Sequence, residues 1–231
     1  MLEQTTIKVG TGEIHVEKLH QGDIFDVTEG MYPSKLIGYT GEGVLKVGAK
    51  TSTTYGYVQS GTVKIKGQKE WELETGYYFS FNEEIEVSGN GSAVFYERYG
   101  FNGPFNIGGP VEKRGRLAYI DGCSDSLLVY PPRLGDPCLN LLVFPKNIHQ
   151  TMHIHPSVRL GLVIEGKGVC ITPEETIDLV EGSVFCLDEM KQHCFHTDEN
   201  NHMKIVAYHP DSDWGPSDEN HPMLNRTFIQ K

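Results

Sequence analysis

Thr151-Met152-His153-Ile154-His155-Pro156 is the stretch that decides how this chain is interpreted, and His193-Cys194-Phe195-His196 follows it about forty residues later. In an extended strand, side chains alternate between the two faces, so His153 and His155 point the same way, about 6–7 Å apart along the chain. Two imidazoles placed like this can hold one ion, and His193 supplies a third nitrogen from a second strand. The two segments predict one metal site delivered by two strands.

The residues around the histidines indicate β-strands joined by tight turns. Residues 159–164 are an apolar run that leads into a glycine turn at Glu165-Gly166, and a second turn at Glu181-Gly182 precedes the strand of His193. Alternation of apolar and polar residues in 62–66 and 92–99 predicts further strands with one face in a core. No long amphipathic helix stands out, so we expect an all-β protein.

The histidine segments resemble the two sequence motifs of the cupin superfamily. His153, His155 and Gly166 stand at the spacings of the first motif, and Gly182 and His193 at those of the second. The resemblance covers about fifty residues. It implies a jelly-roll β-barrel with His153, His155 and His193 as metal ligands.

The chain also departs from both motifs. In the first, Asn147 replaces a glycine and Arg159 replaces the metal-binding Glu. In the second, a proline, a glycine and an asparagine are replaced by Asp188, Met190 and Thr197, respectively. A guanidinium has no lone pair to give a metal, so the usual set of three His and one Glu cannot form. Three histidines remain as expected ligands.

An internal repeat divides the chain into two similar halves. Residues 56–63 align with 161–168 and residues 72–79 with 178–185, at offsets of 105 and 106. Carried back across the repeat, the four histidine positions of the second half fall on Gly48, Lys50, Val87 and Asn90. We therefore expect two fused jelly-roll β-barrels, a bicupin: a degenerate N-terminal barrel (1–105) and a metal-binding C-terminal barrel (106–231).

Composition sets limits on partners and location. A formal net charge of -11 without a basic tract argues against nucleic-acid binding. The N-terminal residues lack a signal-peptide pattern, and no apolar run is long enough to span a membrane. We expect a cytoplasmic protein whose five cysteines are free thiols. The apolar segment 227–229 is expected to add an edge strand or to contact a partner.

Two further residues are candidates for a catalytic role. Arg159 could orient a substrate carboxylate as a bidentate fork, or it could turn away and pair with an acid such as Glu165 or Asp188. His196 has opposite parity to His193 in a regular strand, so it needs a bulge to reach the same cavity. It could be a fourth ligand, a group that contacts a ligand or the substrate, or a surface residue. Structural roles are expected for His149, His202, His209 and His221.

By resemblance to three-His cupins, the expected function is that of an Fe(II)-dependent dioxygenase acting on a small, carboxylated organic substrate. We expect one divalent transition metal per chain, Fe²⁺ by preference, although imidazole also accepts Mn, Ni, Co or Zn. We also expect a homodimer. Two alternatives stay open: a metal-dependent isomerase or lyase, and a non-catalytic small-molecule-binding barrel.

Overall fold

The computed structural model describes residues 12–212, and strands joined by turns make up most of this range. The first half forms a six-stranded sheet, in the order β11-β8-β5-β10-β3-β2, and a four-stranded sheet, in the order β4-β9-β6-β7. Its strands are β2 (Gly22–Asp26), β3 (Ser34–Tyr39), β4 (Leu45–Val47), β5 (Ser52–Ser60), β6 (Thr62–Lys66), β7 (Glu70–Glu74), β8 (Tyr78–Phe81), β9 (Ile85–Gly89), β10 (Ser92–Tyr99) and β11 (Asn106–Gly108).

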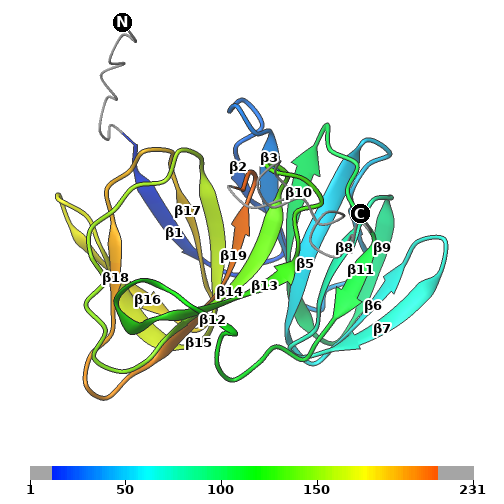
Figure 1. Ribbon diagram of the computed structural model, residues 1–231. Coiled ribbons are helices and arrows are strands. Elements are labelled where there is room, and N and C mark those ends of the chain that lie inside the picture. Colours follow the sequence, from blue (N-terminus) through cyan, green and yellow to red (C-terminus); the bar gives the residue numbers. More distant parts are fainter. Residues whose placement is uncertain (1–11, 213–231) are drawn as a thin grey trace, which may run out of the picture.

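The second half is built around a nine-stranded sheet whose main path is β1-β17-β15-β19-β14-β13-β12. Its elements are β1 (Ile14–Lys18), β12 (Leu117–Ala118), the short 3₁₀-helix η1 (Ile120–Gly122), β13 (Ser124–Val129), β14 (Cys138–Phe144), β15 (Arg159–Ile171), β16 (Thr176–Val180), β17 (Ser183–Leu187), β18 (Cys194–His196) and β19 (Met203–His209). The two halves stand side by side in Figure 1.

The long strand β15 joins the two faces of the second half. Its first residues pair with β17 and β19, and its last residues pair with β16 and β18. The pairing with β19 shifts register between Val163 and Glu165, which is the irregularity that lets a long strand bend from one face to the other. The all-β jelly-roll architecture expected from the sequence is confirmed.

Alternation of side chains lets single strands serve two cores. In β15, Leu160 and Leu162 enter a cluster shared between the halves, whereas Val163 faces the interior of the C-terminal half. In β5, Tyr55 and Tyr57 enter the same shared cluster. The six-stranded sheet and the nine-stranded sheet therefore pack face to face through a common apolar layer, in which the rings of Tyr96 and Tyr208 stack at 5.5 Å.

The internal repeat is confirmed by equivalent packing in the two halves. Gly56 pairs with Phe79, and Gly161 pairs with Phe185 in the corresponding register. A Cβ atom would lie 2.3 Å from the ring of Phe79 at Gly56 and 2.2 Å from the ring of Phe185 at Gly161. Each glycine thus leaves space for a phenylalanine ring from the neighbouring strand.

The division expected at residue 105 does not coincide with the sheets. β1 pairs with β17 over five residues and so lies in the sheet of the second half, as its blue strand in Figure 1 shows. β11 begins just after residue 105, yet it pairs with β8 of the first half. The first strand of the chain therefore helps to build the half that carries the histidines.

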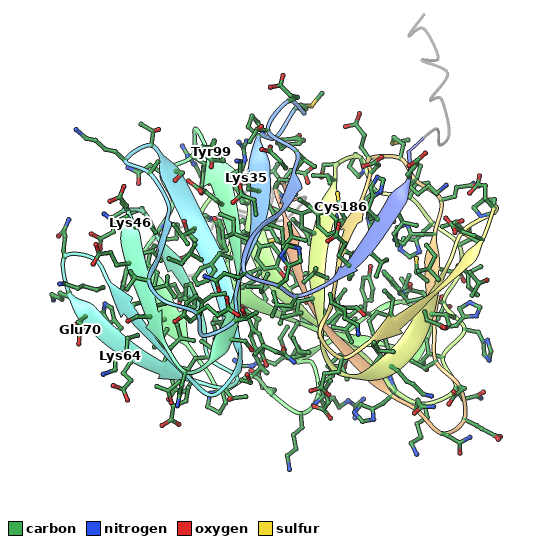
Figure 2. The ribbon with its side chains drawn as sticks, turned by 180° about the vertical axis from the view of Figure 1, so that it is seen from behind. Lys35, Lys46, Lys64, Glu70, Tyr99 and Cys186 are labelled. Carbon is green, nitrogen blue, oxygen red and sulfur yellow. The ribbon has the colours of Figure 1, made fainter. Side chains whose placement is uncertain are left out.

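Charged side chains lie on the outer side of the N-terminal half, and the cysteines lie inside the protein. Lys46, Lys64 and Glu70 are exposed on the outer side of the N-terminal half, away from the shared apolar layer (Figure 2). The expectation of free thiols is confirmed, since all five cysteines are buried and unpaired. Residues 213–231, which include His221 and the segment 227–229, lie outside the described residues.

Candidate metal centre

The three predicted ligands meet where the loop after β14 crosses the segment before β18. His153 and His193 form an isolated antiparallel bridge, in which each amide N–H donates to the carbonyl oxygen of the other residue, at 2.9 and 3.0 Å. The prediction of a regular strand at residues 151–156 is wrong, because His153 alone has strand-like pairing there. A single bridge is enough to bring the two rings together.

The three imidazoles surround one point. Ring centroids are 4.5 Å apart for His153 and His193, 5.0 Å for His153 and His155, and 5.1 Å for His155 and His193. One nitrogen from each ring lies within 4.8 Å of the others. Metal–nitrogen bonds of about 2.1 Å require donor atoms roughly 3–3.5 Å apart, so a bound ion would draw the rings slightly inward. This cluster is the one group of three or more His, Cys, Asp or Glu in residues 12–212 that could hold a metal ion.

Backbone carbonyls set the orientation of two of the rings. Nδ1 of His153 lies 2.8 Å from the carbonyl oxygen of Thr151, and Nδ1 of His193 lies 2.9 Å from that of Lys191. A carbonyl oxygen only accepts, so each Nδ1 carries the proton and donates. The lone pair of Nε2 is then free to bind a metal, which is the usual arrangement of ligating histidines.

The environment favours neutral imidazoles. Burial, together with the charges of Arg159, His193 and His153, lowers the pKa of His155 to about 2. Burial also lowers the pKa of His193 to about 4, with smaller contributions from His153 and Arg159 opposed by the bond to Lys191. Only neutral imidazole has a lone pair for a metal, so the cluster fits a divalent transition ion.

The departures at the two motif glycines preserve the backbone shape of glycine. Asn147 and Met190 both have a φ of +59°, in the left-handed region. Asn tolerates this conformation, whereas Met rarely adopts it. The amide of Met190 donates to the carbonyl oxygen of His155 at 2.7 Å, so this turn holds one ligand segment directly. The two positions therefore keep the backbone conformation of the motif glycines, although neither residue is a glycine.

Arg159 is buried, with 8% of its surface exposed, and it lines a cavity of about 410 Å³ together with His155. The acid that pairs with it is Asp211, at 3.2 Å, rather than Glu165 or Asp188. Glu165 instead pairs with Lys204.

The guanidinium of Arg159 makes its hydrogen bonds from one side. All of them run from Nη1, to the carbonyl oxygens of Ser157 and Val158, the hydroxyl of Ser157 and the carboxylate of Asp211. Nε is buried and has no partner among the described residues. A buried N–H without a partner is costly, so a ligand that brought an acceptor to this edge would relieve that cost.

His196 stands apart from the three ligands, as its parity in the strand suggested. Its ring lies 4.9 Å from that of His149, and its Nε2 lies 3.3 Å from the carbonyl oxygen of Gln150. It lines a separate cavity of about 280 Å³ with His149 and Asp178. The structure therefore does not bring His196 into the histidine cluster. It also places His196 in a different cavity from Arg159, so His196 is neither a fourth ligand nor a contact in the Arg159 cavity.

Two residues of the site were missed in the sequence. His209 lines the same cavity as His155, with their ring centroids 6.3 Å apart, and burial lowers its pKa well below the usual range. Asp211 holds Arg159 in place. The alternation of side chains along the strand could have identified His209. Ile205 and Ala207 face the interior, and His209 is two residues further along on the same face. Asp211 follows the strand and has no such signal.

Among residues 12–108, the N-terminal half has no group of side chains equivalent to the three histidines. Val87, which occupies the position of His193, is fully buried in the core of that half. Lys50 is exposed, and Gly48 lies in the loop after β4 with a φ of +86°. Within the described residues the expected loss of ligands from the first barrel is thus seen in the structure.

Comparisons with known proteins bear on the fold. No protein-family model matches the sequence, and no curated protein sequence matches it. Among solved structures, protein Ylba from E. coli is 16% identical with a TM-score of 0.62, and the match covers 90% of this chain and 95% of that one. A cupin 2 conserved barrel domain protein from Leptotrichia buccalis is 14% identical with a TM-score of 0.56, covering 87% and 97%.

A third similar structure is a salicylate 1,2-dioxygenase from Pseudaminobacter salicylatoxidans. It is 8% identical with a TM-score of 0.63, and the match covers 91% of this chain and 88% of that one. A variant of that enzyme in complex with gentisate matches with 7% identity. Across residues 12–212, no helix has the length and apolar character needed to cross a membrane.

Proposed function

This chain has the cupin fold, and because that fold brings His153, His155 and His193 to one point beside a cavity, we propose that it is a three-histidine Fe(II) dioxygenase for a small carboxylated organic substrate. The observation that carries the proposal is the convergence of three imidazoles, two of them oriented by backbone carbonyls. When bound, a ferrous ion would supply the chemistry with dioxygen.

The lack of a carboxylate ligand supports a site with open positions. Arg159 occupies the place of the fourth ligand, and its ion pair with Asp211 keeps the guanidinium turned to that acid. Three neutral ligands leave more positive charge on the ion than a set containing Glu, which suits an anionic substrate beside dioxygen.

Arg159 supports a carboxylated substrate. Its Nη1 is occupied by protein partners, whereas its buried Nε is without one among the described residues. A substrate carboxylate on the Nε and Nη2 edge would receive two parallel hydrogen bonds, and Asp211 would hold the guanidinium in position for them. The dioxygenase named among the similar structures fits this proposal, since salicylate and gentisate are both carboxylates.

A metal-dependent isomerase or lyase remains the second candidate. The same cluster of three histidines would serve an ion that acts as a Lewis acid. Dioxygen consumption separates the two, because an isomerase or lyase consumes none. A non-catalytic binding barrel would also consume none.

The proposal is tested with an oxygen electrode. Protein reconstituted anaerobically with Fe(II) is mixed with a panel of small hydroxy- and amino-carboxylates, and protein reconstituted with Zn(II) serves as the control. We expect dioxygen uptake that requires iron and one class of carboxylate. Turnover of a carboxylate with either metal and without dioxygen uptake would instead establish the second candidate.

Arg159→Lys is expected to leave the metal content unchanged while raising KM for the carboxylated substrate roughly tenfold or more. Lys keeps the positive charge but loses the planar bidentate contact. Metal analysis and steady-state kinetics on the same preparation separate the two effects. Arg133→Lys is the matched control, because Arg133 is exposed and pairs with Asp136 at the surface. Equal KM values in both variants would remove Arg159 as the carboxylate site.

The homodimer and the cytoplasmic location stay predictions.

A further inference from the structure

A second pair of polar side chains also lines the Arg159 cavity. Asp125 on β13 and Asn140 on β14 both line the cavity, and each is buried, with 8% and 9% of its surface exposed. β19 lies between β14 and β15 in the sheet, so two strand spacings, about 10 Å, separate the strand of Asn140 from that of Arg159. The cavity therefore has two polar ends.

The amide of Asn140 is oriented by Asp125. Its Nδ2 donates to the carboxylate of Asp125 at 2.9 Å. Because an ionised carboxylate only accepts, the amide oxygen must point the other way. This Oδ1 is buried and has no partner among the described residues. Asn140, which lines the cavity, thus carries a buried acceptor that lacks a donor.

The charges in the cavity are unevenly matched. Arg159 has its carboxylate, Asp211, at 3.2 Å. Asp125 is bonded to a neutral amide, and no Lys, Arg or His forms an ion pair with it in the described part of the chain. Burial accordingly raises the pKa of Asp125, against the opposing effect of Asn140. A buried carboxylate without a cation is costly, and a cationic group on a ligand would relieve that cost.

Apolar side chains also line the cavity. Leu117, Leu127 and Cys138 contribute to it, and its volume of about 410 Å³ suits a small organic molecule. An apolar carbon frame can therefore span from one polar end to the other.

We propose that this cavity binds a small amino-carboxylate, with its carboxylate on the open edge of Arg159 and its ammonium group on Asp125 and the amide oxygen of Asn140. This inference deepens the proposed function and rests on it in taking Arg159 as the carboxylate site. Binding itself requires neither iron nor turnover, so it is measurable in metal-free protein.

Titration calorimetry with matched sets of ligands tests the proposal. One set is 4-aminobutyrate, 4-hydroxybutyrate and butyrate, and another is 4-(aminomethyl)benzoate, 4-(hydroxymethyl)benzoate and 4-methylbenzoate. In at least one set, we expect the amino member to bind roughly tenfold or more tightly than both others, because it alone brings a cation to Asp125. Its methyl ester should lose the contact with Arg159 and bind as weakly as they do.

Asp125→Asn is the diagnostic variant, because it keeps the shape and the hydrogen-bonding capacity while removing the charge. It removes a buried charge, so we expect the protein to fold. The preference for the amino member should fall to about twofold or less. Asp178→Asn is the matched control: it also removes one negative charge, but Asp178 is exposed and lines the other cavity. This control should keep the full preference.

The outcomes separate this inference from the proposed function. If hydroxy or unsubstituted members bind as tightly as amino members, or if no set binds, the inference is overturned even where iron-dependent dioxygen uptake is found. If amino members are preferred and Asp125→Asn abolishes the preference, the inference stands even where no dioxygen is consumed. A preference that survives in Asp125→Asn would also overturn it.

Discussion

Replacing His153 and His155 together with Ala is expected to lower the bound metal from about one ion per chain to below about 0.1 and to abolish metal-dependent turnover. A single remaining histidine, His193, cannot hold a divalent ion against water and buffer. Metal analysis after gel filtration gives the occupancy, and far-UV circular dichroism checks the fold. Both histidines lie in a loop segment, so we expect the fold to survive the change.

The control for this double variant is His15→Ala with His20→Ala. These two residues are exposed and lie outside the histidine cluster. The control protein should keep its metal. Retention of a full ion by the variant lacking His153 and His155 would show that the metal is held elsewhere.

Gly161→Ala is expected to destabilise the protein by roughly 1–3 kcal/mol, because the new methyl group would overpack the core. The added Cβ would lie 2.2 Å from the ring of Phe185, which is buried between strands and has little room to move. Denaturant unfolding followed by fluorescence measures the loss.

Gly30→Ala provides the comparison for this change. A Cβ at Gly30 would have one close neighbour, the carbonyl oxygen of Val27 at 3.3 Å, and Gly30 lies in a turn. The free energy of unfolding should change by less than about 1 kcal/mol. Equal stability of the two variants would contradict the packing role assigned to Gly161 and, through the repeat, to Gly56.

The sequence was informative where the structure depends on local rules. Gly166 and Gly182 were predicted as turn residues, and both have positive φ angles. His193 and His196 are three residues apart, and in a regular strand this spacing places their side chains on opposite faces. The sequence therefore predicts that the two side chains point in different directions. The three ligands could be predicted from the sequence because His153 and His155 are two residues apart and His193 lies in the second motif.

Other features depend on contacts that no local pattern contains. β1 pairs with a strand about 170 residues later, and nothing in its own residues indicates that partner. Asp211 and Asn140 reach the Arg159 cavity through the order of strands β15, β19 and β14 in the sheet, which sequence alternation does not specify. The prediction of a strand at 151–156 failed because the polar turn after β14 needs only one bridge to position the histidines.

The metal content of the wild-type protein, purified without chelator, tests the central claim most directly. One set of ligands in the C-terminal half predicts close to one divalent transition ion per chain. A ratio near two would mean that the N-terminal half also binds metal. A ratio near zero that does not rise on anaerobic addition of Fe(II), Mn(II), Ni(II), Co(II) or Zn(II) would contradict the metal centre itself.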